Sequence, residues 1–319
     1  MTKVWNADSM LGFVDVRRKL PVKNQSLTQL GRGLLEANAS VISGSDAALY
    51  YATIGNLSHT MIELNSGYTG ILVPIRWRGE FLINGAQVRP GEMYLPQDEV
   101  LFEAHGEERT TLGISMLREH LIVTLAALQG VAPDAVPLDG GALELSPADM
   151  TSGRRSLTKL LNRSIDSSNQ EPLPVHSAEH LVRQITQILI SLYLQARPAK
   201  TPAVRSAARL TRIVHTAEER FAAAQAGPLS LADLCVAAGV SNVTLCHAFM
   251  VVCGSSPMAY FKKRRLTDAR LALMGGDRET DLVKRAALGA GLTHMGRFSA
   301  EYHQLFGELP TTTLNQTQH

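Results

Sequence analysis

The cysteine and histidine side chains are the first candidates for chemistry, because they bind metal ions and act as nucleophiles or bases. The 319-residue chain has three cysteines, Cys235, Cys246 and Cys253, and no Cys-x-x-Cys pair. His59 and His105 stand alone in the first half, so the His-x-His pair of a metal-binding cupin is absent. No Gly-rich phosphate loop and no nucleophile elbow occur either. We therefore expect buried or half-buried thiols, no metal, no cofactor and no catalytic site.

Two segments near the end of the chain repeat one order of small, apolar and polar residues. Corresponding residues are 52 positions apart at the shared glycine and 53 apart from Leu245 and Phe298 onward, which places one extra residue early in the second helix of the second copy. The first copy is residues 231–241 followed by Leu245, Phe249, Gly254 and Pro257. The second copy is residues 283–293 followed by Phe298, Tyr302, Gly307 and Pro310.

Each repeated position has a physical reason. Gly239 and Gly291 stand where a helix ends and a tight turn needs a positive φ. Ser241 and Thr293 follow, and their hydroxyls can cap the next helix. The two large apolar residues after each cap are four apart, so they lie on one face of that helix and leave the opposite face free. This pattern predicts two helix-turn-helix units, in which the second helix enters the major groove of DNA.

A further helix is predicted between the two units. Ser255-Ser256-Pro257 begins it, and it continues over residues 258–274. Because it is a single rigid element, it would fix the separation of two helices that must reach major grooves about 34 Å apart. It carries the run Lys262-Lys263-Arg264-Arg265, which is either a solvated face or a set of phosphate contacts.

Length and charge agree with a two-part, DNA-binding chain. The composition is 45% hydrophobic and 19% charged, which suits packed domains. Residues 203–319 carry 13 Lys+Arg and 9 Asp+Glu, or +4, whereas the preceding residues carry −2. A basic second part favours a polyanion as partner. No secretory signal is visible, and the apolar runs at 121–128 and 188–194 are shorter than the about 20 residues of a membrane span, so we expect a cytoplasmic protein without a membrane partner.

The first half has a strand-like pattern between residues 40 and 116. Asn84-Gly85 follows the apolar triplet 81–83 and predicts a hairpin turn, because both central residues tolerate positive φ. Several strands at short, regular spacing indicate a small barrel or sandwich. The predicted strands are residues 48–54, 60–64, 70–75, 80–83, 92–95, 100–104 and 110–116.

Helical patterns follow at residues 117–129, 146–166 and 180–195. In the third helix, Leu181, Ile185, Ile188 and Leu192 are spaced by four, three and four residues, as in a heptad seam. This stripe either packs on its own barrel or forms a dimer contact, and one helix can do both. The prolines of residues 197–204 then interrupt any helix and mark a linker.

Over residues 204–314 the sequence resembles the AraC/XylS family of transcription regulators. The motifs that carry the resemblance are Leu-Ser-Leu-Ala-Asp-Leu from Leu229, Gly-Ser-Ser-Pro-Met-Ala-Tyr-Phe-Lys-Lys-Arg-Arg-Leu from Gly254, and Phe-Ser-Ala-Glu-Tyr-His-Gln-Leu-Phe-Gly-Glu-Leu-Pro from Phe298. Residues 294–306 look most similar to the ethanolamine-operon regulator branch, which does not identify an effector, since sensing domains in this family diverge.

The resemblance implies an α+β chain with three parts. They are a cupin-like sensing or dimerisation domain at 1–196, a linker at 197–204, and an all-α DNA-binding domain at 205–319 with helix-turn-helix units at about 230–252 and 282–305. It also implies double-stranded promoter DNA as a partner, a homodimer, contact with RNA polymerase and, where the first domain is a sensor, a small-molecule effector.

The resemblance also carries over residues that contact DNA. Base-reading positions fall on Val243, Cys246, His247, Met295, Gly296, Ser299 and Ala300. Backbone contacts fall on Ser241, Thr293 and Arg297, and the basic run adds Lys262 and Lys263. Few of the base-reading side chains make bidentate hydrogen bonds, so we expect modest direct readout with more from DNA shape and phosphates.

Two alternatives concern the first half. Tyr50, His59, Arg76 and Trp77 either line a small-molecule pocket or are ordinary core and surface residues. The second alternative is a DNA-repair enzyme that carries this type of DNA-binding domain. Such an enzyme needs a clustered-cysteine zinc site, and the first half has no cysteine.

Overall fold

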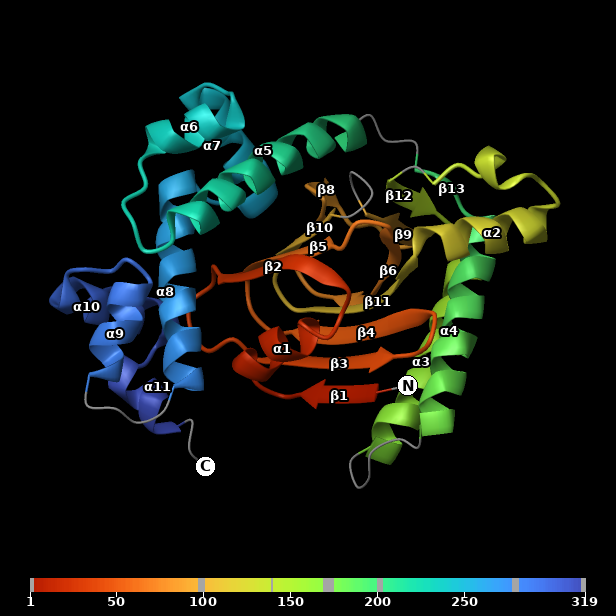
Figure 1. The fold of residues 1–319 in the computed structure, drawn as a ribbon, viewed down its shortest axis with the longest axis horizontal. Coiled ribbons are helices and arrows are strands. Elements are labelled where there is room, and N and C mark those ends of the chain that lie inside the picture. Colours follow the sequence, from red (N-terminus) through yellow and green to blue (C-terminus); the bar gives the residue numbers. More distant parts are fainter. Residues whose placement is uncertain are drawn as a thin grey trace.

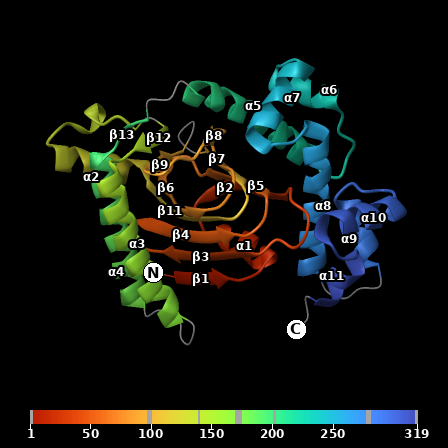
Figure 2. The same cartoon turned by 180° about the vertical axis from the view of Figure 1, so that it is seen from behind.

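A β-rich first part and an all-helical second part make up the chain. The computed structural model describes residues 3–96, 101–138, 140–168, 175–199, 203–276 and 281–316. Figure 1 shows the second part packed against one end of the sheets, with helix α4 (Val175–Gln195) at the other end, and Figure 2 shows the same from behind. The predicted α+β order is therefore confirmed.

The larger sheet has eight strands, and its pairings are antiparallel. Its centre is β11 between β4 and β6, and the face that packs against α2 (Arg118–Gln129), α3 (Pro147–Ser168) and α4 supplies much of the first part's core. In spatial order the strands are β1 (Lys3–Ala7), β3 (Ala37–Ser43), β4 (Ala47–Ile54), β11 (Arg109–Leu117), β6 (Tyr68–Trp77), β9 (Glu92–Leu95), β12 (Gly141–Glu144) and β13 (Arg197–Pro198).

The smaller sheet has five strands and lies over the larger one. Its order is β2 (Val22–Gln29), β5 (Ser58–Leu64), β10 (Leu101–Gly106), β7 (Phe81–Ile83) and β8 (Ala86–Gln87). The predicted hairpin joins β7 and β8, with φ of 50° at Asn84 and 70° at Gly85. The described strands thus form two separate sheets, not one closed barrel. Of the predicted strand 100–104, Val100 lies outside the described residues.

The first 43 residues contain elements that the sequence pattern did not predict. They are β1, β2, β3 and helix α1 (Met10–Arg17), which begins at the N-cap Ser9. Apolar residues of α1, β3 and β4 pack together in a core of their own. The amphipathic signal of β2 is weak because its polar side chains are buried against the helical part, as described below.

The predicted helices of the first part are present as α2 (Arg118–Gln129), α3 (Pro147–Ser168) and α4, with a 3-10 turn at Pro133–Ala135. The heptad-like stripe of α4 packs on the protein's own sheet: Leu181, Ile185 and Leu192 are buried in the main core, and Ile188 packs against it. That stripe is therefore not free to form a dimer seam, and a dimer through α4 would have to use its other face.

In the part of the chain that the structure describes, seven helices form the second part. They are α5 (Ala203–Ala224), α6 (Leu231–Ala238), α7 (Asn242–Cys253), α8 (Pro257–Gly275), α9 (Leu282–Gly289), α10 (Met295–Phe306) and α11 (Pro310–Gln316). Two cores divide them, one around α5, α6 and α7 and one around α9, α10 and α11, and α8 contributes to both. In the predicted linker, Arg197–Pro198 pairs with β12, and Lys200, Thr201 and Pro202 lie outside the described residues.

Within the described part of the chain, none of the helices taken singly has the length and apolarity of a membrane span. The bent pair α6 and α7 meets that test by length and composition when its two helices are taken together.

Candidate nucleic-acid interface

The first helix-turn-helix unit has the predicted local geometry. Ser230 and Asp233 form a capping box that begins α6, with mutual bonds of 3.2 Å and 2.9 Å to backbone N–H groups. Gly239 ends α6 with φ of 62°. Ser241 Oγ then accepts from the N–H of Thr244 at 3.3 Å and caps α7. Helices α6 and α7 meet at 89°, an angle that lets a second helix protrude into a DNA groove.

The second unit repeats this arrangement with one difference at the turn. Gly291 has φ of 75°, as predicted. The N-cap of α10 is His294, whose side chain makes no capping bond, so the expectation that Thr293 caps this helix is wrong. The cause is the extra residue between glycine and helix, which moves the helix start beyond Thr293 and leaves Thr293 exposed in the turn.

Helix α7 has one buried face and one exposed face. Leu245 and Phe249 are fully buried in the core of the first unit. Val243 is 79% exposed and His247 is also exposed, so both base-reading candidates are accessible. Cys246 is half-buried, and its thiol donates to Asn242 Oδ1 at 3.2 Å.

Helix α10 has the same division. Phe298 and Tyr302 are buried, whereas Gly296, Arg297 and Ala300 are exposed. The remaining two candidates are half-buried, because Met295 packs against the core of the second unit and Ser299 lies beside that face. Across both helices, four of the seven base-reading candidates are thus exposed.

Other exposed side chains on these helices were not among the predicted positions. They are Asn242 and Met250 on α7, and His303 and Gln304 on α10. Asn242 and Gln304 carry amides, the groups that pair with adenine in two bonds. The sequence could have indicated these residues, because they alternate with the buried anchor residues and so fall on the exposed face of each helix.

The basic run of α8 proves to be a structural feature. Lys262 pairs with Glu301 at 2.6 Å, and Lys263 Nζ donates to the backbone oxygen of Leu30 at 2.8 Å. Arg265 donates to the backbone oxygens of Gly291 and Gly227 at 2.8 Å and 2.6 Å. In this conformation the run therefore ties α8 to its neighbours, although the Lys262 side chain is still 44% exposed, and phosphate contact by Lys262 and Lys263 stays a prediction.

Glu301 holds two of the predicted phosphate-binding cations. Its carboxylate lies 2.6 Å from Arg297 Nε and 2.6 Å from Lys262 Nζ. Burial raises the pKa of Glu301, but hydrogen bonds and attraction from these two positive charges outweigh burial and lower it. Arg297 remains mostly exposed, so DNA phosphates can compete for it.

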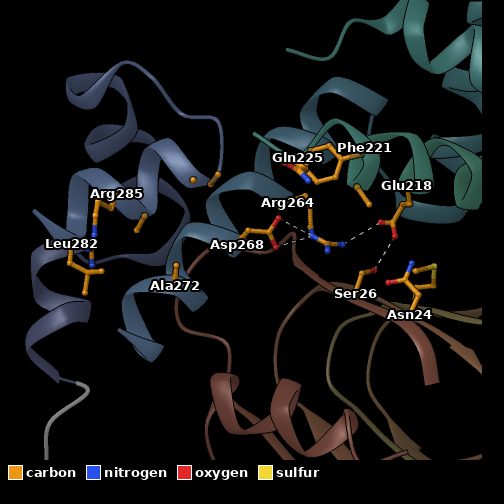
Figure 3. A pocket seen from close by; sticks show the side chains of 15 residues that line it. Asn24, Ser26, Glu218, Phe221, Gln225, Arg264, Asp268, Ala272, Leu282 and Arg285 are labelled. Carbon is orange, nitrogen blue, oxygen red and sulfur yellow. Dashed lines mark hydrogen bonds and ion pairs between the residues drawn. The ribbon is translucent and has the colours of Figure 1, made fainter. Parts of the chain in front are cut away.

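A buried polar cluster joins the two parts of the chain. His59 Nδ1 on β5 lies 2.9 Å from the hydroxyl of Tyr260 on α8, which donates to Glu218 on α5. Ser26 of β2 donates to the other oxygen of Glu218 at 3.0 Å. Arg264 lies 3.7 Å from Glu218 and 3.0 Å from Asp268 (Figure 3).

Burial and neighbouring charges shift the pKa values of the two carboxyl groups near His59. Burial raises the pKa of Glu103, whose carboxylate is 3.8 Å from His59 and has no hydrogen-bond partner among the described residues. Burial also opposes ionisation of Glu218, but Arg264 and His59 together lower its pKa. The contact between the two parts thus includes a buried polar cluster whose hydrogen bonding is incomplete, beside apolar contacts such as that of Leu30 with the core of the first unit.

The four predicted pocket residues do not meet in one pocket. Tyr50 is buried between the sheets, and His59 belongs to the polar cluster on the outer face of the smaller sheet. Arg76 is exposed and pairs with Glu108 at 3.0 Å. The Trp77 ring packs against Arg154, and the guanidinium carbon of Arg154 lies 5.4 Å from the centre of that ring. Only Tyr50 lines an interior cavity, which contains two buried arginines that the sequence pattern did not single out.

The remaining candidates for chemistry are the three thiols and one group of possible metal ligands. Cys235 and Cys246 are half-buried, and burial raises the pKa of the Cys253 thiol. In the described ranges a single group has metal-ligand spacing, formed by Glu63, His215 and Glu219, with one ligand atom of each within 4.8 Å. Lys23 forms an ion pair with Glu63 at 2.7 Å.

Two helices with exposed faces, each the second helix of a helix-turn-helix unit and linked by one rigid helix, define a DNA-binding protein. The helix-turn-helix domain family profile matches residues 234–316. The chain is 30% identical over 138 residues to the XylDLEGF operon transcriptional activator 2 of Pseudomonas putida, covering 43% of this chain and 85% of that protein. The chain belongs to the AraC/XylS family and is a DNA-binding transcription regulator.

Other similar proteins match shorter stretches of this chain. Two further XylDLEGF operon activators of Pseudomonas putida are 34% identical over 88 residues, which span 28% of this chain and 27% of each of those proteins. The probable thc operon regulatory protein of Rhodococcus erythropolis is 34% identical over 105 residues, covering 33% of this chain and 32% of that protein. The solved structure of a probable AraC family regulator from Rhodopseudomonas palustris CGA009 is 34% identical, covers 34% of this chain and 98% of that chain, and superposes with a TM-score of 0.31.

Proposed function

We propose that α7 and α10 enter successive major grooves on one face of promoter DNA. The observation that carries this is that both helices present exposed side chains opposite a fully buried anchor pair. Base contacts then come from Val243, Cys246, His247, Met295, Gly296, Ser299 and Ala300, with Asn242 added. Backbone contacts come from Ser241, Thr293 and Arg297, while Lys262 and Lys263 contribute only after leaving their present partners.

The first part is proposed to be a cupin-like sensing domain of a homodimeric, cytoplasmic regulator. Support comes from its two-sheet architecture, its interior cavity and its polar contact with α5 and α8. We further propose that the regulator activates transcription through RNA polymerase, in line with the activators to which it is similar. The likeness of residues 294–306 to the ethanolamine-operon branch remains a hypothesis about this segment.

The test is DNA binding by matched charge variants of the full-length protein. Val243→Glu and Ala300→Glu place a negative charge on the exposed faces of α7 and α10 and should each weaken promoter binding by at least tenfold. Leu128→Glu on α2 is the control, since Leu128 is also exposed, at 61%, but lies in the first part. Equal affinity of all three variants and the parent protein in gel shifts would contradict the proposed interface.

A further inference from the structure

A small cavity of about 70 Å³ lies between the two sheets of the first part. Its ionisable groups are Arg17 at the end of α1, Arg109 at the start of β11, and Tyr50 of β4, and hydroxyl groups of Thr60, Thr111 and Ser115 also line it. The rest of the wall is predominantly apolar and includes Ile54, Ile62, Leu64, Ile71, Leu72 and Phe102. An apolar cavity with two cationic groups is suited to a molecule that has an anionic end and an apolar end.

Both arginines are buried without a counter-ion. Each is 2% exposed. Arg17 donates to the backbone oxygens of Ser26 and Met61 at 3.4 Å and 3.0 Å, and Arg109 donates to that of Gly106 at 2.6 Å. Arg17 Nε and Arg109 Nη2 have no hydrogen-bond partner, and neither guanidinium has a carboxylate partner among the described residues.

This arrangement is unfavourable as it stands. Taking a cation out of water costs several kcal/mol unless an anion compensates. Burial lowers the pKa of Arg109 to about 9, and the positive charge of Arg17 contributes to that shift. The two guanidiniums therefore repel each other, and Tyr50 beside them is a neutral phenol whose pKa is raised by burial. A single anion between them would relieve both effects.

We propose that this cavity binds a small monocarboxylate, with its carboxylate shared by Arg17 and Arg109 and its apolar part between the sheets. The inference rests on the proposed sensing function, because it assigns the chemical class of the effector. The cavity has room for about five to seven water-sized groups, since one such group needs about 10–15 Å³. A chain of the size of butyrate fits that limit.

The site also has a route to the DNA-binding part. The two carbonyl groups that Arg17 holds belong to Ser26 and Met61, whose side chains point outward to α5. Ser26 Oγ donates to Glu218 at 3.0 Å, and Met61 Sδ lies 3.1 Å from His215 Nδ1. A carboxylate that draws Arg17 toward the cavity would therefore act on the two strands that hold α5.

The test measures butyrate binding to the full-length protein by calorimetry and thermal unfolding. Butyramide, which has the same size without the charge, and potassium chloride at equal ionic strength are the matched controls. Butyrate should raise Tm by several degrees at saturation, because it binds only the folded protein, while butyramide and chloride should not. An equal shift with butyramide or with chloride would overturn the carboxylate assignment.

Variants separate a binding role of the arginines from a structural one. Arg109→Met should raise Tm without butyrate, since it removes an unpaired buried cation, and should weaken butyrate binding at least tenfold. Arg76→Met, at an exposed arginine, should leave binding unchanged. Undiminished butyrate binding by Arg109→Met would contradict the site.

A second variant covers the case in which Arg109→Met does not fold. A Cβ at Gly113 would lie 3.4 Å from Leu72 Cδ1 and 3.7 Å from Tyr50 Cδ1, both on the cavity wall. Gly113→Val should therefore fill the cavity and weaken butyrate binding at least tenfold with both arginines in place. Unchanged binding would overturn the proposal. If butyrate binds but does not change DNA affinity, the binding site is supported and its effector role is contradicted. If DNA binding is intact but butyrate does not bind, only the proposed site is contradicted, and the DNA-binding function stands.

Discussion

The phenol oxygen of Tyr260 lies 2.9 Å from Nδ1 of His59 and joins two residues that are 201 positions apart. One belongs to the helix that connects the two DNA-reading units, and the other to a strand of the first part. The connecting helix therefore carries a direct mechanical link to the domain proposed as the sensor. This contact is polar. A measurement can therefore follow its formation and loss separately from the folding of either part.

Tyr260→Phe tests that link. The ring keeps its edge contacts with Phe249 and Phe261, whose centroids lie 5.4 Å and 5.3 Å away, while His59 and Glu218 lose a buried partner. We expect a loss of about 1–3 kcal/mol in the free energy of unfolding, measured by urea denaturation. Tyr51→Phe is the control, since no hydrogen bond of Tyr51 is found within the described ranges. Equal effects of both variants would show that the hydroxyl of Tyr260 contributes nothing.

His105 makes stability depend on pH. Burial, with repulsion from His59 and Arg109, lowers the pKa of His105 from 6.5 to about 3. Between these values the unfolded chain binds a proton that the folded chain does not, so stability falls as pH falls below 6.5. At pH 5.5 the loss is about 1.4 kcal/mol, which follows from one pKa unit.

The check is urea denaturation of His105→Gln and of the parent protein between pH 5 and 8. The difference between their pH dependences should match that loss in sign. His303→Gln, at an exposed histidine of α10, serves as the comparison and should keep the dependence of the parent protein. A parent-like slope in His105→Gln would exclude this histidine as the source.

Gly239 and Gly291 have the same backbone conformation but different surroundings. A Cβ at Gly239 meets nothing within 4 Å, whereas one at Gly291 would collide with Arg265 and with the backbone oxygen of Ala226. Gly239→Ala should thus cost about 1–2 kcal/mol from its left-handed conformation alone. Gly291→Ala should cost clearly more, because its clash adds to the same term. Thermal or chemical unfolding that ranks the two variants in the opposite order would contradict the turn geometry described for the second unit.

Glu301 is predicted to restrain DNA binding. Its carboxylate holds both Arg297 and Lys262 at 2.6 Å, so Glu301→Gln should release these cations for phosphates. We expect tighter DNA binding at low salt and a steeper salt dependence, by about 0.9 in the logarithmic slope for each added phosphate contact. Arg297→Ala should weaken binding to all sequences alike. Fluorescence titrations at several salt concentrations measure both effects, and a flatter slope in Glu301→Gln would count against this role.

Local signals predicted the elements that depend on near neighbours. The cap at Ser241, the left-handed glycines and the Asn84-Gly85 hairpin each need only a few consecutive residues, and all three are present. The anchor spacing of four likewise determined which faces of α7 and α10 are buried. The turn before α10 was mispredicted at Thr293, because an inserted residue alters the register of a cap without changing the pattern around it.

Features that depend on distant partners could not be read from the sequence. Strand β2 has few apolar residues because Ser26 and Thr28 face the polar surface of the helical part. The basic run of α8 looks like a phosphate-binding face until Leu30, Gly227 and Glu301 are brought beside it. Arg17 and Arg109 are unremarkable in sequence, and only the packing of two sheets places them in one cavity.

The central claim is that α7 and α10 read DNA together while α8 holds them apart. The most direct measurement is a hydroxyl-radical footprint of the full-length protein on sites selected from a random DNA library. Two protected segments about 10–10.5 base pairs apart on one face of the duplex are expected, with Val243→Glu erasing one and Ala300→Glu the other. A single protected segment that both variants weaken equally, or protection that neither variant changes, would contradict the account.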